Sequence, residues 1–209
     1  MERRKKSLLI ALCLGDGHIN KRDNCLQITH SYKQKFYIEY KCKLLSELLN
    51  CKEPNLYHRL DSKHNEYTLT KGSRFFRYIR KMLYKDGEKR FSKNILKYIT
   101  PEALAIWWMD DGSHSIDKNK TTGKITSHSF HLYTYTNLED TNNIIEMLNS
   151  KFGITMYKIK RVMADRSIKY YLKCRTKEGR KLSNLLEPYI LKEFNYKIIT
   201  HEQDATNNG

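Results

Sequence analysis

The alternation of apolar and polar residues along this chain predicts short helices and strands in a regular order. Residues 33–49 place apolar side chains every three or four positions, which is the spacing of an amphipathic helix. In residues 25–30, Leu26 and Ile28 alternate with polar residues, which predicts a half-buried strand. The first half is predicted to form a helix over 7–16, a strand over 25–30, a helix over 33–49, a hairpin over 55–60 and 66–70, and a helix over 73–84.

The second half of the chain repeats this order. Thr100 and Pro101 have the residue types of a helix N-cap and a first helical position, so a helix is expected to begin there. Beyond that helix we expect a polar loop over 113–126. The remaining prediction is a strand over 128–136, a helix over 138–151, strands over 154–162 and 168–174, and a helix over 179–191 that Pro188 kinks or shortens.

The repeated order predicts an α+β protein built from two pseudo-symmetric αββαββα repeats. We expect the first repeat over residues 1–99, the second over 100–200, and a polar C-terminal tail over 201–209. A chain of 209 residues is long enough to bury an apolar core.

Each half opens with an apolar helical run that stops on an aspartate followed by a glycine, at Asp16-Gly17 and Asp111-Gly112. Gly17 is expected to take the left-handed conformation common at helix C-termini. Ala11 and Gly15 lie four residues apart on one helical face, where small side chains let a second helix approach closely. Side-by-side packing of the two runs would bring the two aspartates together.

Two aspartates at neighbouring helix ends form an oxygen-rich site suited to Mg²⁺, and the partial negative charge of helix C-termini favours cations further. Bound ions of this kind activate water and stabilise the attacking and leaving oxygens in phosphodiester hydrolysis. The alternative is an ordinary helix-ending turn with a solvated aspartate. Duplication of the pair on a basic chain favours the metal site.

The formal net charge of +16 and the isoelectric point near 9.6 indicate a polyanionic partner. A basic surface of this size binds nucleic acid through counterion release, and the 15 tyrosines add amphipathic side chains suited to contact surfaces. The alternative is a soluble protein with many surface lysines. Membrane binding is disfavoured because no separate basic amphipathic helix is visible.

The five cysteines are scattered and form no close Cys-x-x-Cys pair. We therefore expect free thiols and an intracellular, reducing compartment. The N-terminal apolar run is interrupted by Gly15-Asp16-Gly17 and is too short for a signal peptide or a spanning helix.

The segments Leu9–Gly17 and Thr100–Gly112 resemble the two motifs of the LAGLIDADG homing endonucleases, in the group that carries both repeats in one chain. The resemblance implies motif helices packed at the interface of the two repeats and an antiparallel β-saddle that lies on the DNA major groove. It also implies that Asp16 and Asp111 are catalytic and bind metal. Asp110 stands where the family has a small residue, so a packing or supporting role is expected for it.

The resemblance further implies a basic residue near each metal site, with a role in transition-state stabilisation or in ordering the attacking water. Lys197 matches this place in the second half, and Lys89, closely followed by Arg90, is the candidate in the first. His30 is a weaker catalytic candidate at the end of its strand. The alternatives are solvated lysines and a satisfied surface histidine.

Magnesium is the expected cofactor, with Mn²⁺ as a substitute and Ca²⁺ as an ion that binds without supporting cleavage. The backbone carbonyls of Gly15 and Asp110 are further candidate ligands. The candidate DNA-binding residues lie on predicted strands and turns, where they have access to a groove. They are Lys21, Arg22, Gln27, Thr29, Arg59, Lys63, Thr68, Lys71, Lys158, Lys160, Arg161, Arg166, Lys169, Lys173 and Arg175.

The leading hypothesis is a monomeric, site-specific double-strand DNA endonuclease that leaves 3′ overhangs and promotes the mobility of its intron. A maturase that binds intron RNA and a non-catalytic DNA-binding descendant are the alternatives. Retention of both aspartates favours the enzyme, because a protein that only binds DNA has no need for paired acids. The expected location is an organelle if the protein is encoded in an intron there, and otherwise a bacterial or phage-infected cytoplasm.

Overall fold

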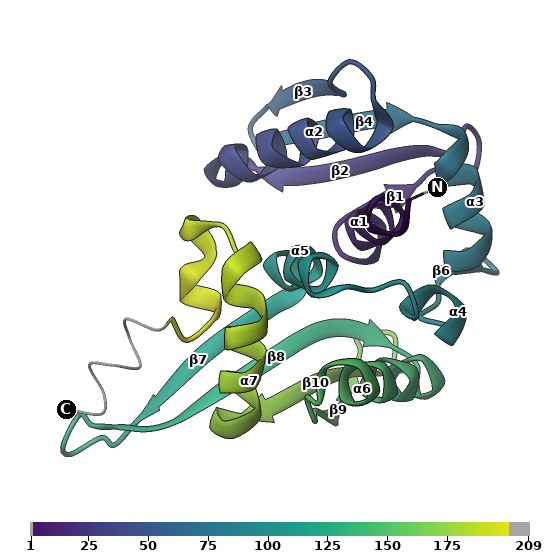
Figure 1. The fold of residues 1–209 in the computed structure, drawn as a ribbon. Helices are drawn as coiled ribbons and strands as arrows, with labels where there is room; N and C mark the ends of the chain where they lie inside the picture. Colours follow the sequence, from purple (N-terminus) through teal and green to yellow (C-terminus); the bar gives the residue numbers. More distant parts are fainter. Residues whose placement is uncertain (1, 201–209) are drawn as a thin grey trace. The chain divides into compact units, whose positions relative to one another are not determined.

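The computed structural model describes residues 2–200 and divides into two compact units, unit 1 up to Lys89 and unit 2 from Arg90 (Figure 1). This division falls ten residues before the one expected from sequence. None of the helices in residues 2–200 is long and apolar enough to cross a membrane. The predicted polar tail over 201–209 lies outside the described residues.

Unit 1 places an antiparallel sheet against helices in the predicted order. Its sheet runs β1-β2-β4-β3. Its elements are α1 (Arg3–Leu14), β1 (His18–Ile19), β2 (Cys25–Ser31), η1 (Tyr32–Gln34), α2 (Lys35–Leu49), β3 (Asn55–Leu60), β4 (Asn65–Gly72), α3 (Arg74–Leu83), β5 (Tyr84–Lys85) and β6 (Glu88–Lys89).

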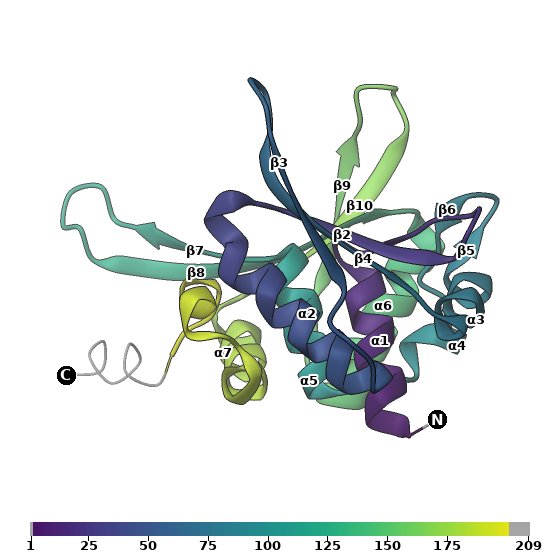
Figure 2. The same ribbon diagram turned by 90° about the horizontal axis from the view of Figure 1, so that it is seen from above.

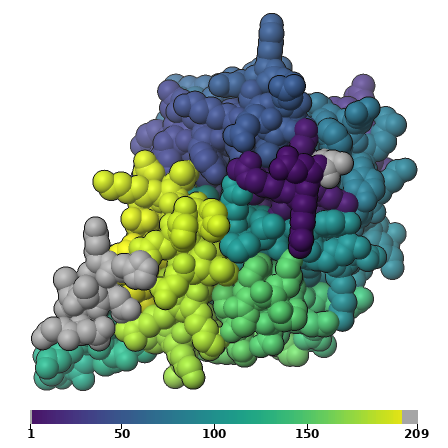
Figure 3. All heavy atoms as spheres, in the orientation of Figure 1, coloured from purple at the N-terminus to yellow at the C-terminus, as the bar shows by residue number. Residues whose placement is uncertain are grey.

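Unit 2 repeats this topology, with sheet order β7-β8-β10-β9. Its elements are α4 (Lys93–Leu96), α5 (Pro101–Asp111), β7 (Gly112–Lys118), β8 (Ile125–Thr136), α6 (Leu138–Phe152), β9 (Tyr157–Val162), β10 (Ile168–Arg175), α7 (Thr176–Leu186), η2 (Glu187–Tyr189) and η3 (Lys192–Lys197). The side chains of α7 and the turns after it form one continuous surface, yellow in Figure 3. The predicted α+β class with repeated antiparallel sheets is confirmed.

Alternation along the strands places one face of each sheet against helices. In unit 1, Leu26 and Ile28 of β2 are fully buried on the side covered by α2, and so are Tyr37 and Ile38 of that helix. In unit 2, Phe130 and Leu132 of β8 are fully buried in the same way. Apolar burial therefore selects which face of each strand turns inward and leaves the other face open.

One sequence prediction is wrong in unit 2. The expected polar loop over 113–126 contains β7, which pairs with β8 from Gly112 opposite Leu132 to Lys118 opposite Ile125. This hairpin extends well beyond the helices (Figure 2) and is mostly exposed, so backbone hydrogen bonds hold β7 without any apolar alternation to mark it. The last helix, expected over 179–191 and kinked or shortened by Pro188, spans Thr176–Leu186 and is followed by a 3₁₀ turn over Glu187–Tyr189, so Pro188 shortens it as expected.

Candidate active site

Asp16 directly follows the C-terminal end of α1, where the chain turns into β1. The helix ends at Leu14, and the Gly15 N–H closes its last turn onto the Ala11 carbonyl. Gly17 does not have the left-handed backbone expected from sequence. Glycine is needed there for a close approach, since a Cβ atom would lie 2.0 Å from the Leu12 carbonyl oxygen. This tight turn leaves the Asp16 side chain exposed at the helix end.

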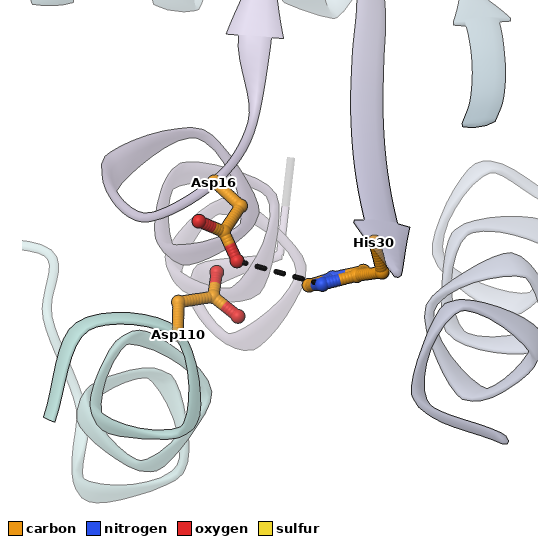
Figure 4. Close-up of side chains that lie close together, drawn as sticks. All are labelled: Asp16, His30 and Asp110. Atoms are coloured by element: carbon orange, nitrogen blue, oxygen red, sulfur yellow. Dashed lines mark ion pairs between the residues drawn. The ribbon is translucent and has the colours of Figure 1, made fainter. Parts of the chain in front are cut away.

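His30 points toward Asp16 from β2 (Figure 4). Its Nδ1 lies 3.7 Å from Asp16 Oδ2, and its side chain is 3% exposed. Of the two interpretations made from sequence, the surface histidine is wrong, because His30 is buried at the end of the inward-facing row Leu26, Ile28, His30. Asp110, also labelled in Figure 4, belongs to α5 and is described below with that helix.

Lys89, the last residue of β6, lies close in space to the C-terminal end of α1, beside the turn that carries Asp16. Its Nζ donates to the carbonyl oxygens of Gly15 at 2.6 Å and Leu14 at 3.4 Å. The last carbonyls of a helix have no partner within the helix and carry partial negative charge, so an ammonium group stabilises them on both counts. Burial raises the pKa of the nearby Cys13 thiol to about 12, with the Lys89 charge acting in the opposite direction.

In unit 2, helix α5 ends in two adjacent aspartates, Asp110 and Asp111. The Thr100 side chain caps this helix by accepting from the Ala103 N–H at 3.3 Å, as predicted. At the other end, Asp110 and Asp111 are both half-buried. The Trp107 indole N–H donates to Asp111 Oδ2 at 2.9 Å, an interaction within the helix that sequence reasoning missed.

Lys197 reproduces in unit 2 what Lys89 does in unit 1. Its Nζ donates to the carbonyls of Met109 at 2.6 Å and Asp110 at 3.3 Å, and its side chain is buried. The Trp108 indole N–H donates in turn to the Lys197 carbonyl at 3.0 Å. In each unit, therefore, the last carbonyls of the helix that carries the aspartate accept hydrogen bonds from a lysine near the end of that repeat.

Two of these hydrogen bonds go to the backbone carbonyls that were expected as further metal ligands. The carbonyls of Gly15 and Asp110 each accept a hydrogen bond from a lysine. Arg90, the second choice in the first repeat, is engaged elsewhere, since it donates to Asp140 at 2.7 Å and to Glu139 at 2.8 Å near the start of α6.

The strand register places the candidate DNA-binding residues of unit 1 on different surfaces. Residues directly opposite each other in an antiparallel pair share a face, so Lys71, opposite Leu26, lies on the helix side, where its Nζ donates to the Lys52 carbonyl at 3.0 Å. Gln27, Thr29, Thr68 and Arg59 lie on the open face, and Lys21, Arg22 and Lys63 lie in turns.

The same reasoning divides the candidates of unit 2. Lys158 is opposite Leu172, and its Nζ reaches Asn142 of α6 at 3.1 Å, so it faces the helix. Lys160 shares that side. Arg161, Lys169, Lys173 and Arg175 lie on the open face, and Arg166 lies in the β9–β10 turn.

The open face of unit 2 also carries an aromatic cluster that sequence reasoning missed: His131, Tyr133, Tyr135 and Tyr171. Neighbouring rings lie 5.3–6.1 Å apart between centroids, at an irregularity in the β8–β10 pairing. Arg161 donates to the Tyr135 hydroxyl at 2.9 Å. Burial, aided by the Lys173 charge, lowers the pKa of His131, so this imidazole is neutral at pH 7.

The fold and these sites define a two-repeat α+β protein with an acidic helix end in each unit and one open, polar sheet face per unit. The chain belongs to the LAGLIDADG DNA endonuclease family, whose model matches residues 6–182. The family resemblance expected from the two motifs is thus confirmed.

Individual relatives agree with this assignment. The probable intron-encoded endonuclease 1 of Wickerhamomyces canadensis is 29% identical over 207 residues, covering 93% of this chain and 84% of the relative. The cytochrome b mRNA maturase bI2 of Saccharomyces cerevisiae is 27% identical over 209 residues, and the match spans less than half of its length. The structure of the homing endonuclease I-WcaI bound to its DNA recognition sequence has a TM-score of 0.69 and 25% identity, covering 94% of this chain and 86% of that one.

Proposed function

We propose that this protein is a monomeric, site-specific endonuclease that hydrolyses both strands of a long DNA target. The observation that carries the proposal is an arrangement found in both units, an acidic side chain at the C-terminal end of a helix whose last carbonyls accept hydrogen bonds from a lysine. The chain that carries it belongs to a DNA endonuclease family. A protein that only bound DNA would have no use for this arrangement in both units.

Asp16 and Asp111 are the residues that we expect to hold divalent metal. The donors fit Mg²⁺, because they are carboxylate oxygens at helix ends, where partial negative charge favours a cation. When bound, the metal supplies an activated water and stabilises charge on the phosphate oxygens. Lys89 and Lys197 hold the two helix ends in place through hydrogen bonds to backbone carbonyls. We expect their positive charge to stabilise the transition state at the scissile phosphates.

The open sheet faces are the surfaces that we expect to contact DNA. In unit 2 the aromatic rings lie against one another, so they present hydroxyl groups and ring edges rather than open ring faces. Edges of this kind suit contacts in a groove of duplex DNA, whereas unpaired bases stack on exposed ring faces.

Two residues on β9 test which face contacts DNA. Arg161→Ala is expected to weaken target binding by about 1–3 kcal/mol, because the guanidinium lies on the open face. Lys158→Ala, the matched change on the helix face, is expected to alter binding by less than roughly twofold, because a charge beyond that face is largely screened. Equal losses in both variants, measured by fluorescence anisotropy at fixed salt, would contradict this assignment of the faces.

A cleavage assay tests the proposed function. The protein is incubated with plasmid that carries the intron-less form of its host gene, in Mg²⁺, Mn²⁺, Ca²⁺ or EDTA. A single linear product with 3′ overhangs is expected with Mg²⁺ or Mn²⁺, and binding without cleavage is expected with Ca²⁺. Intact plasmid under all four conditions would reject the endonuclease.

An intron-RNA maturase is the second candidate, and the similarity to the yeast maturase is the observation that favours it. It predicts tight binding of the cognate intron RNA and faster splicing of that intron in vitro. Intact plasmid together with this RNA activity would assign the maturase function in place of the nuclease. Both activities together would indicate a bifunctional protein.

A further inference from the structure

A lysine is fully buried in the middle of α2. Lys41 has no exposed surface, and the side chains around it on this helix, Ile38 and Leu45 among them, are apolar. Burial of a lysine is costly unless its ammonium group is hydrogen-bonded. The Lys41 Nζ lies 3.0 Å from His30 Nε2 and 4.2 Å from the ring centroid of Tyr37.

With Lys41 as an ammonium group, this contact favours one tautomer of His30. An ammonium group has three donors and no acceptor, so it donates to Nε2. The neutral imidazole then carries its proton on Nδ1, the atom that lies 3.7 Å from Asp16 Oδ2. A protonated ring nitrogen has no lone pair for a metal, so in this tautomer Nδ1 directs an N–H toward the Asp16 carboxylate.

Aromatic packing holds the imidazole in this orientation. The ring of Tyr37 lies 5.0 Å from that of His30, and Tyr40 stacks on Tyr37 at 6.1 Å with an interplanar angle of 11°. Tyr37 therefore contacts both Lys41 and His30, and its packing restricts the side-chain conformations of both.

Unit 2 has no equivalent of this arrangement at the corresponding positions. Lys41 is the seventh residue of α2, and the seventh residue of α6 is the buried Ile144. The last inward-facing residue of β8 is Thr136, whose hydroxyl donates to Asp140 at 3.2 Å. The Lys41–His30 contact therefore has no counterpart at these positions of unit 2.

We propose that Lys41 is a positioning residue, which sets the tautomer of His30 and through it the orientation of Asp16, in unit 1 alone. Its consequence is that cleavage of one DNA strand depends on Lys41 more than cleavage of the other strand does. This consequence rests on the proposed nuclease function. The chemical step is still carried out at Asp16 and its counterpart in α5. Lys41 prepares only the acidic residue of unit 1.

The experiment compares wild type with Lys41→Met and Lys41→Gln, and uses Lys43→Met as the matched control on an exposed position of α2. Long-range ¹H–¹⁵N NMR of the intact protein, without metal or DNA, reports the His30 tautomer. Wild type and the control are expected to show the proton on Nδ1, and the two Lys41 variants are expected to lose this preference. With each strand separately labelled, single-turnover cleavage of one strand is expected to slow roughly 10-fold, as for other residues that orient a metal ligand, and that of the other strand about twofold or less.

Several outcomes would overturn the inference. One is a wild-type protein that carries the His30 proton on Nε2. This measurement does not depend on whether any variant folds. Another is a Lys41 variant that keeps the wild-type tautomer, and a third is an equal slowing of both strands with a matching loss of thermal stability, which indicates a structural role only. If wild type cuts no DNA, the proposed function fails, while the NMR measurement still decides the link between Lys41 and His30.

Discussion

Asp16→Asn and Asp111→Asn are each expected to abolish double-strand DNA cleavage while target binding is retained. Asparagine has nearly the same shape as aspartate but lacks its charge, and it replaces one acceptor oxygen by an N–H donor. Loss of a group that acts in the transition state is expected to slow single-turnover cleavage on the order of 10³-fold or more. Asp86→Asn is the matched control, because Asp86 lies in an exposed turn at φ 53°, where asparagine is well tolerated.

Asp110→Asn separates the two neighbouring acids of α5. Asp111 Oδ2 accepts a hydrogen bond from Trp107, so one of its oxygens is already engaged within unit 2. We expect Asp110→Asn to retain most of the cleavage rate. The reverse result, with Asp110→Asn inactive and Asp111→Asn active, would move the catalytic role by one residue, and wild-type rates for Asp16→Asn would contradict the proposed site.

Lys197→Met is expected to destabilise the protein as well as to impair cleavage. The buried ammonium group donates to two carbonyls at the end of α5, and methionine fills similar space without any donor. Loss of hydrogen bonds from a charged donor, with the carbonyls left buried, is expected to lower the free energy of unfolding by about 2–3 kcal/mol. Urea denaturation followed by circular dichroism measures this change.

Two comparisons sharpen the lysine prediction. Lys89→Met is expected to lower the free energy of unfolding by less, about 1 kcal/mol, because Lys89 is only half-buried. Lys192→Met, an exposed position on η3, is expected to change it by less than about 0.5 kcal/mol. Unchanged stability in Lys197→Met with complete loss of cleavage would show that this lysine acts only in the chemistry and does not hold the helix end.

Strong local patterns made most of the elements predictable. The helix over 33–49 and the strand around Leu26 and Ile28 were visible because one face of each is buried, and burial leaves a period in the sequence. The strand β7 was missed because it is held by backbone pairing and has few buried side chains. Pro188 was recognised as a residue that kinks or shortens the last helix, and this helix ends at Leu186.

Only part of the candidate site was predictable from the sequence. The two Asp-Gly pairs and the positions of Lys89 and Lys197 were visible as motifs, because the residues near them in sequence follow the family pattern. The bonds from these lysines to helix carbonyls were not visible, since they join residues that are 74 and 88 positions apart. The Lys41 ammonium was hidden for another reason: in a chain with 39 lysines and arginines, a single buried lysine carries no sequence signal.

The sequence by itself determined the repeated order of elements, the acidic helix ends and the basic character that points to nucleic acid. These properties are local or additive, so spacing and composition record them. Only the tertiary structure decided which strand residues face outward, which carbonyls the two lysines close, and that His30 lies between Lys41 and Asp16. Those properties depend on strand register and on contacts between distant residues, and a one-residue change in register would reverse them.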